Sequence, residues 1–142
     1  MTRAIKLFTR AEAERTLPLV SRIVRDLMAE YPLWRRAVAR YELLTGGARA
    51  DWGETRDLLA ARDEVTRHAD RINRFLLELE MVGCVFKGFD AGLVDFYSLR
   101  EDRVVFLCWK LGEERITHWH ELDAGFAGRR PIEPANLSEA HP

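Results

Sequence analysis

The chain from Thr9 to Val82 carries hydrophobic residues at alternating steps of three and four. Stripes of this kind are typical of helices that pack along a shared seam. The pattern predicts two long helices, one ending near Thr45 and one running from about Glu54 to Val82, that form an antiparallel hairpin. The two stripes are Val20, Val24, Leu27, Tyr31, Trp34, Val38 and Tyr41, and Leu58, Ala61, Val65, Ala69, Ile72, Leu76 and Leu79.

The ends of these helices carry recognisable signals. Thr9 and Glu12 have the spacing of a capping box, in which each side chain bonds the backbone amide of the other residue. Gly83 follows the second stripe, where a left-handed cap is expected. Pro18 is expected to bend or restart the first helix, and Pro32 to kink it, because a proline ring displaces the carbonyl four residues back.

The second half of the chain changes to alternating polar and apolar residues with turn residues between them. Four strands are predicted, over residues 84–87, 93–99, 103–111 and 115–122. The expected fold is therefore α+β: a long antiparallel helical hairpin (10–82) packed on a four-stranded antiparallel β-meander (83–123). One domain over residues 1–130 is expected, followed by a flexible tail over 131–142.

The turns set the expected register. Glu101 and Asp102 fit a two-residue hairpin, and Gly112 fits the first central position of a type II′ turn over 111–114. Counting from these turns places Asp95 opposite Cys108, and Cys108 opposite Thr117.

Two faces of the sheet follow from this register. The more apolar face, which the helices should cover, carries Val94, Phe96, Val105, Leu107, Trp109, Ile116, His118 and His120. The other face groups Asp95, Cys108, Lys110, Thr117, Trp119 and Glu121.

Charge and composition narrow the function classes. The 22 basic and 23 acidic residues nearly cancel, so no overall field attracts nucleic acid or an anionic membrane. Apolar runs are too short for a membrane span, and no signal peptide is visible. Two cysteines, Cys84 and Cys108, form neither a disulfide scaffold nor a Cys-x-x-Cys pair, so a cytoplasmic location is expected.

Several motifs resemble a bacterial family catalogued as domain of unknown function 2203. They include Gly92-Leu93-Val94-Asp95-Phe96, Leu107-Cys108-Trp109-Lys110-Leu111-Gly112-Glu113, Trp119-His120-Glu121 and, as shorter matches, Leu17-Pro18, Lys87, Gly125-Phe126 and Arg129. The likeness covers nearly the whole chain. It implies a bacterial origin and a shared site in the sheet half of the protein, and it carries no activity.

His118 and His120 are the first candidates for chemistry. Two histidines separated by one residue on a strand point to the same side and can chelate zinc, iron or manganese. A metal site normally needs a third protein ligand, so packing of both rings at the edge of the core is the alternative. The expected metal ligands are His118 and His120.

Asp95 and Glu121 are candidate acid–base groups beside Lys110 and Thr117. An ordinary cross-strand ion pair on a solvated face is the alternative. Cys108 is expected to be a small buried thiol, because the predicted register puts both histidines on the opposite face.

Two function classes remain open from the sequence. The first is a small ligand- or metal-binding protein, a class that includes enzymes. The second is a homodimeric interaction module, in which Ile23, Met28, Leu33, Leu43 and Leu44 pair with a second copy. The first class assigns catalytic roles to His120, Glu121 and Asp95, and ligand binding to Lys87, Trp109, Glu113, Trp119 and Arg129.

Overall fold

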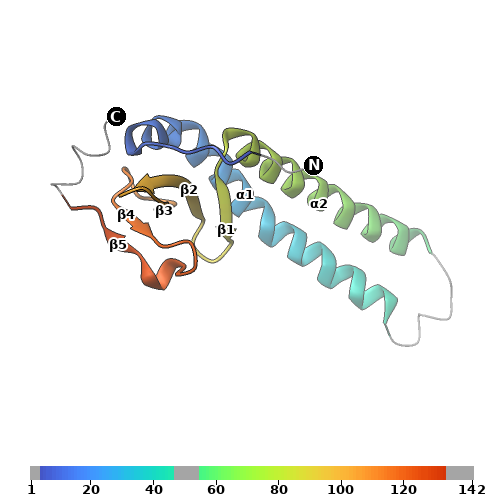
Figure 1. The fold of residues 1–142 in the computed structure, drawn as a ribbon. Helices are drawn as coiled ribbons and strands as arrows, with labels where there is room; N and C mark the ends of the chain where they lie inside the picture. The colour runs from blue at the N-terminus through green and yellow to red at the C-terminus, as the bar shows by residue number, and fades with distance from the viewer. Residues whose placement is uncertain (1–3, 47–54, 134–142) are drawn as a thin grey trace. The chain divides into compact units, whose positions relative to one another are not determined.

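The computed structural model describes residues 4–46 and 55–133. The chain divides into two compact units, each of which is described by itself. The first comprises the residues up to Arg25 and from Glu78 onward, and the second is Asp26–Leu77. Figure 1 shows the elements in order from the blue N-terminal arm to the red last strand.

Helix α1 (Arg10–Thr45) begins at the predicted capping box. The Thr9 amide donates to Glu12 Oε1 at 2.8 Å, and the Glu12 amide donates to Thr9 Oγ1 at 3.1 Å. The sequence suggested that Pro18 bends or restarts this helix and that Pro32 kinks it. A restart is wrong, because α1 is one continuous helix through Pro18 and Pro32. Pro18 lies in the early part of a helix that packing stabilises. The backbone hydrogen bond that proline cannot donate therefore does not end the helix.

Helix α2 (Arg56–Val82) begins after Thr55, whose hydroxyl accepts the amide of Leu58 at 3.2 Å. It ends at Gly83, where φ is 109°. A Cβ atom at Gly83 would approach Phe8 within 3.2 Å, so both the backbone angle and the space favour glycine. The predicted helix start at Glu54 and most of the predicted loop lie outside the described residues.

The unit formed by Asp26–Leu77 contains the distal parts of both helices. Leu27, Ala61 and Ile72 from the predicted stripes are buried, which confirms the helical hairpin. The buried carboxylate of Glu30 contacts His68 of α2 and lies 3.2 Å from Arg71 Nε. These polar contacts link the two helices in addition to the packing of their apolar stripes.

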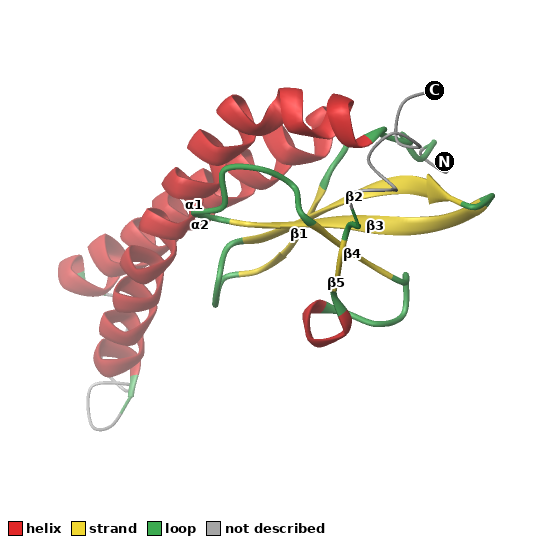
Figure 2. Cartoon of the chain, turned by 90° about the vertical axis from the view of Figure 1, so that its left-hand side faces the viewer, coloured by secondary structure: helices red, strands yellow, loops and turns green. Residues whose placement is uncertain are grey.

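The sheet has five antiparallel strands in the order β1-β2-β3-β4-β5. They are β1 (Val85–Gly88), β2 (Leu93–Arg100), β3 (Arg103–Lys110), β4 (His118–His120) and β5 (Arg130–Pro131). Figure 2 shows β2 and β3 as the longest arrows of the sheet. The α+β class and the meander are confirmed, and the strand count differs from the predicted four by the short β5.

The hairpin of β2 and β3 has the predicted register. Asp95 pairs with Cys108, and Arg100 pairs with Arg103 across the turn. Glu101 and Asp102 have φ angles of 52° and 64°. Two positive φ angles are the signature of a type I′ turn, whose twist matches that of the flanking strands.

The predicted register between β3 and β4 is wrong by one residue. Cys108 pairs with His118 instead of Thr117, and Phe106 pairs with His120. The turn lies one residue earlier than expected, since the Glu113 amide donates to the Lys110 carbonyl at 3.0 Å. Gly112 is then the third residue of the turn, and its φ of 104° suits a type II turn. A further loop separates this turn from β4.

This slip exchanges the two faces of β4, because side chains alternate along a strand. Both histidines lie on the same face as Cys108, and Trp119 lies opposite Leu107 on the face that α1 covers. The predicted grouping of Asp95 with Trp119 and Glu121 is therefore wrong, whereas Asp95 and Lys110 share a face as predicted. The physical reason is that Trp119, the largest apolar side chain of this stretch, belongs in the core, where it is buried.

The covered face of the sheet packs against α1 and the N-terminal arm. Phe8 meets Phe96 edge to face, with ring centroids 5.1 Å apart, and its amide donates to the Tyr97 carbonyl at 2.8 Å. The Ile116 amide donates to Glu14 Oε2 of α1 at 2.9 Å. The core of this unit includes Ala13, Leu17, Val20, Val24, Val94, Phe96, Val105, Leu107 and Trp109.

Strand β5 pairs with β4 through Trp119 and Arg130. The Ile132 amide extends the ladder by donating to the Thr117 carbonyl at 2.8 Å. The sequence predicted the start of a tail here, and residues 134–142 of it lie outside the described residues. Within the described part of the chain, neither helix has an apolar stretch that would cross a lipid bilayer.

Candidate metal centre

Three neighbouring strands bring Asp95, Cys108 and His120 together on the face of the sheet opposite α1. Each offers one ligand atom, and these atoms all lie within 4.8 Å of one another. The residues are 2%, 1% and 3% exposed, so the cluster is closed to bulk water. The register of the three strands produces this convergence. Asp95 pairs with Cys108, and Phe106, two residues from Cys108 on β3, pairs with His120.

The imidazole of His120 is held at both nitrogens. Nδ1 lies 2.8 Å from the backbone carbonyl oxygen of Glu121, and Nε2 lies 3.1 Å from Asp95 Oδ2. A carbonyl oxygen only accepts, so Nδ1 carries hydrogen and donates to it. Nε2 then faces a carboxylate, and this contact is a hydrogen bond only when a proton lies between Nε2 and Oδ2.

The carboxylate of Asp95 is incompletely bonded. Its Oδ2 atom faces His120 and also lies 3.9 Å from the Lys87 ammonium. Its Oδ1 atom is buried and has no hydrogen-bond partner among the described residues. Burial raises the pKa of Asp95, and the nearby charges of His120 and Lys87 offset part of that rise. An unpaired buried carboxylate oxygen of this kind is a natural position for a cation.

Cys108 carries the third ligand atom. Burial raises the pKa of its thiol to about 12, and the negative charge of Asp95 contributes to the rise. Without a metal the thiol is therefore protonated at neutral pH. A bound metal ion would reverse this balance, because coordination deprotonates a thiol outright.

Lys87 forms the outer edge of the cluster. Its side chain is 40% exposed, and its ammonium lies 4.6 Å from the centroid of the Phe106 ring. Val85 pairs with Asp95, so Lys87, two residues farther along β1, lies on the face that carries Asp95. The side chain of Lys87 therefore separates the buried cluster from solvent.

The other predicted site residues have separate contacts. The Glu121 carboxylate pairs with Arg103, at 3.1 Å and 2.7 Å, and only its backbone carbonyl reaches His120. His118 lies on the same face as His120, but its Nδ1 contacts the Thr117 hydroxyl at 2.9 Å. Burial and the charge of Arg129 lower the pKa of His118. His118 is not among the three ligand atoms that converge on Asp95.

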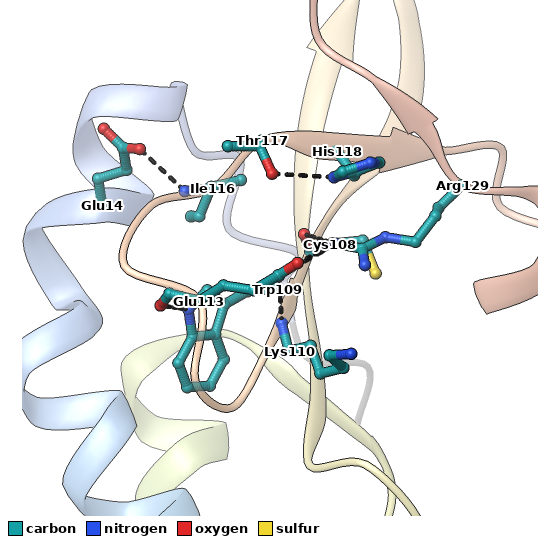
Figure 3. A network of polar contacts seen from close by, with 9 residues as sticks. All are labelled: Glu14, Cys108, Trp109, Lys110, Glu113, Ile116, Thr117, His118 and Arg129. Atoms are coloured by element: carbon teal, nitrogen blue, oxygen red, sulfur yellow. Dashed lines mark hydrogen bonds and ion pairs between the residues drawn. The ribbon is translucent and has the colours of Figure 1, made fainter.

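Glu113 and Arg129 form a second polar network beside Cys108 (Figure 3). One guanidinium nitrogen of Arg129, Nη2, lies 3.1 Å from both carboxylate oxygens of Glu113 and 3.3 Å from the Cys108 carbonyl. Glu113 also accepts the Lys110 amide and, through its carbonyl, the Trp109 indole N–H, both at 2.8 Å. Burial alone would raise the pKa of Glu113, but these hydrogen bonds lower it. The network braces the strand that carries Cys108.

The two tryptophans predicted to bind a ligand differ in place. Trp109 is buried in the core, and its indole N–H donates to the Glu113 carbonyl. The ring of Trp119 lies on the covered face, with the guanidinium carbon of Arg100 at 4.4 Å and that of Arg130 at 5.4 Å from its centroid. Strand alternation places both rings on the face of the sheet opposite Asp95, Cys108 and His120.

Residues 6–132 match the family described as uncharacterized conserved protein (DUF2203). The chain belongs to this family. The DUF2203 match spans all five strands and both helices, and it confirms the family resemblance of the sequence motifs. No curated protein and no solved structure matches the chain.

Sequence reasoning found two members of the cluster, Asp95 and His120, and missed Cys108 as their partner. The correct β2–β3 register already placed Cys108 opposite Asp95. One available signal was the apolar character of Trp119. Aligning it with Leu107 on the core face would have moved His120 to the side of Cys108.

Proposed function

We propose that this DUF2203 protein binds a divalent transition-metal ion through Asp95, Cys108 and His120. The convergence of a carboxylate, a thiol and an imidazole within 4.8 Å carries the proposal. Metal bonds of about 2.0–2.3 Å in a tetrahedral arrangement require donor atoms roughly 3.3–3.8 Å apart. Small side-chain rotations would bring the three atoms to that spacing.

The donor set favours zinc or iron over manganese. A thiolate and an imidazole are ligands of soft and borderline metals, whereas manganese, magnesium and calcium prefer oxygen. The hydrogen bond from His120 Nδ1 to the Glu121 carbonyl supports this proposal, because metal-bound histidines usually donate their other N–H to a carbonyl or carboxylate. That bond leaves Nε2 as the coordinating nitrogen.

Charge balance also supports the proposal. The ligands Asp95 and Cys108 would contribute two negative charges to a dication, and His120 would remain neutral. When no metal is bound, the Lys87 ammonium, 3.9 Å from Asp95 Oδ2, provides the positive charge near this carboxylate. We infer that metal entry displaces this ammonium toward solvent, where the exposed part of the side chain already lies.

Metal analysis of matched variants tests the proposal. Purified protein is loaded with zinc or iron(II), dialysed, and assayed for bound metal, and cobalt(II) is added to report a thiolate charge-transfer band. Cys108→Ser and His120→Gln should each lower affinity by more than the roughly 10–100-fold typical of changes outside the ligand shell. The control variants are Cys84→Ser, at the other buried cysteine, and His118→Gln, on the same strand.

Stoichiometric metal that the controls retain and both site variants lose would support the proposal. Absence of stoichiometric binding at saturating metal would overturn it. So would equal loss in His118→Gln and His120→Gln, because that result would assign the metal to the histidine pair instead.

A second candidate function is acid–base catalysis by Asp95 and His120. It is favoured by the hydrogen bonds of His120, which require a proton between Nε2 and Oδ2. The burial of both groups limits this candidate, since a substrate must reach the proton within hydrogen-bond distance. Metal binding needs no such access for a large molecule, so the geometry supports it better.

A cytoplasmic location stays a prediction.

A further inference from the structure

The candidate metal centre offers three protein ligands to a metal ion. Among the described residues, Asp95, Cys108 and His120 are the group whose donor atoms converge within 4.8 Å. Structural zinc sites normally have four protein ligands, whereas sites with three leave a position for water or another exogenous ligand. A fourth ligand of the proposed metal would therefore come from outside this group.

Three nearby side chains that could bind a metal, those of His118, Glu121 and Glu113, have contacts of their own. None of the three belongs to the converging group. The contacts are those of His118 with the Thr117 hydroxyl, of Glu121 with Arg103, and of Glu113 with Arg129. Either carboxylate would give up an ion pair on moving to the metal, so an exogenous ligand completes the coordination shell at lower cost.

The charges around the cluster favour a negatively charged ligand. Asp95 and the thiolate of Cys108 would together balance the charge of a divalent metal ion. The guanidinium of Arg129 is already balanced by Glu113, at 3.1 Å. The Lys87 ammonium, 3.9 Å from Asp95 Oδ2, then leaves the loaded centre with a net positive charge. An anion in the fourth position would neutralise that charge.

Metal binding would also weaken the present contact between Lys87 and Asp95. The 3.9 Å between Lys87 Nζ and Asp95 Oδ2 is longer than a hydrogen bond, and coordination would share the charge of this carboxylate with the metal. The second contact of Lys87 is with the Phe106 ring, whose centroid lies 4.6 Å from Nζ. A cation–π contact involves the charge of the ammonium and leaves its N–H donors able to bond an acceptor.

The surroundings of the cluster limit the size of this ligand. The three metal-ligand residues are buried, and so is Phe106, whose ring centroid lies 5.4 Å from that of His120. The side chain of Lys87, which is 40% exposed, forms the side of the cluster that reaches solvent. An ion of a few atoms can pass beside a flexible lysine, whereas an aromatic anion would need the strands to separate.

We propose that the metal centre keeps an open coordination position that binds a small anion, such as hydroxide, hydrogencarbonate or azide. The anion would donate an electron pair to the metal in place of a bound water molecule, which leaves to solvent, and would lie near the Lys87 ammonium. This inference rests on the proposed metal binding by Asp95, Cys108 and His120. It makes the centre a site that exchanges ligands, in contrast to a closed structural metal site.

Azide titration of the full chain loaded with cobalt(II) tests the proposal, because the visible spectrum of cobalt changes with its coordination. Stoichiometric loading is checked first, and ionic strength is held constant. We expect a saturable change with azide and none with benzoate. Lys87→Gln should weaken azide binding by about 3-fold, the effect of one partly exposed charge. Lys6→Gln is the matched control and should leave azide affinity unchanged, since Lys6 lies over the Phe8 ring of the N-terminal arm.

The outcomes separate this inference from the proposed function. Stoichiometric cobalt whose spectrum azide leaves unchanged would overturn the open position, while metal binding by the three residues would stand. Saturable binding of benzoate as tight as that of azide would overturn the limit to small anions. Full azide affinity in Lys87→Gln, or an equal loss in Lys6→Gln, would overturn the assignment of the anion to the side of Lys87. A protein that binds no cobalt would overturn both proposals.

Discussion

Asp95 Oδ2 and His120 Nε2 lie 3.1 Å apart although 25 residues separate them in the chain. The other nitrogen of His120 donates to a backbone carbonyl, so a single proton or a metal ion must lie between the two side chains. Both groups are buried, so leaving either of them without its proton or metal partner would cost free energy. We therefore expect the stability of the protein to depend on pH and, with the proposed metal bound, on metal concentration.

In the metal-free protein, Asp95→Asn should increase the free energy of unfolding at neutral pH. Burial raises the pKa of Asp95, so its contribution to stability is present below its unfolded pKa and lost as pH rises through its folded pKa. An asparagine amide carries no charge and donates to the unprotonated Nε2 atom. We expect a gain of about 1 kcal/mol at pH 7, because the raised pKa of Asp95 means that its charged form costs stability there.

Urea unfolding at pH 4 and at pH 7 measures this gain. The gain should shrink as pH falls toward 4, because protonation of the wild-type carboxyl removes the charge that the variant lacks. Asp90→Asn, at an exposed loop position, is the control and should leave stability unchanged at both values. A loss of stability at pH 7 in Asp95→Asn would contradict the expectation.

Both thiols should be unreactive in the folded, metal-free protein. Burial raises the pKa values of Cys84 and Cys108 to about 12, so little thiolate exists at pH 8. A disulfide reagent that releases a coloured thiolate should react slowly with native protein and rapidly after unfolding in guanidinium chloride. Fast labelling of Cys108 in the native state would show that its site opens to solvent.

Arg129→Gln should destabilise the sheet by about 1–3 kcal/mol at neutral pH, the range for hydrogen bonds to charged groups. The loss should shrink in acid. Hydrogen bonding to Arg129 and to the Lys110 amide outweighs burial and lowers the pKa of Glu113. Its stabilising effect is thus present above the unfolded pKa and is lost as pH falls through the folded pKa.

A double-mutant cycle with Glu113→Gln isolates the pair from the other contacts of Arg129. Arg130→Gln, at an exposed position of β5, is the neighbouring control. Additive losses in the double variant would show that the pair contributes no coupling energy.

Replacing Glu101-Asp102 by Asn-Gly should stabilise the hairpin of β2 and β3. Both residues have positive φ, which asparagine and glycine adopt at lower cost. We expect about 0.5–1 kcal/mol, measured as a raised thermal midpoint. Gly112→Ala, where φ is 104°, is the reverse control and should lower the midpoint. An unchanged midpoint in the first variant would mean that the turn is not strained.

The homodimer expected from the sequence stays a prediction, with one correction to its surface. Ile23, expected on the outer flank of the first helix, is buried at 4% exposure and belongs to the core of the sheet unit. Leu43 is 80% exposed, and Leu33 is also exposed. If these residues pair with a second copy, Leu43→Asp should shift sedimentation toward monomer, while Leu99→Asp, at an exposed strand position, should not.

Local patterns were sufficient to predict much of this fold. The capping box at Thr9, the end of α2 at Gly83 and the hairpin at Glu101-Asp102 all depend on contacts within a few residues. The heptad stripes predicted both helices for a similar reason, because burial of a helix face repeats with the helical period. These features are properties of short stretches of sequence.

The candidate site depends on a longer-range choice. A loop follows the turn at Gly112 before β4 begins, so the turn does not fix the register of β4, which differs by one residue from the predicted one. Side chains alternate along a strand, so that single residue decides whether His120 faces the helices or Cys108. Burial of Trp119 beside Leu107 made the choice, and the free energy of packing a large apolar side chain exists only in the folded protein. The sequence by itself determined the helices, the hairpin and the identity of two site residues. Tertiary packing alone decided which partners those residues meet.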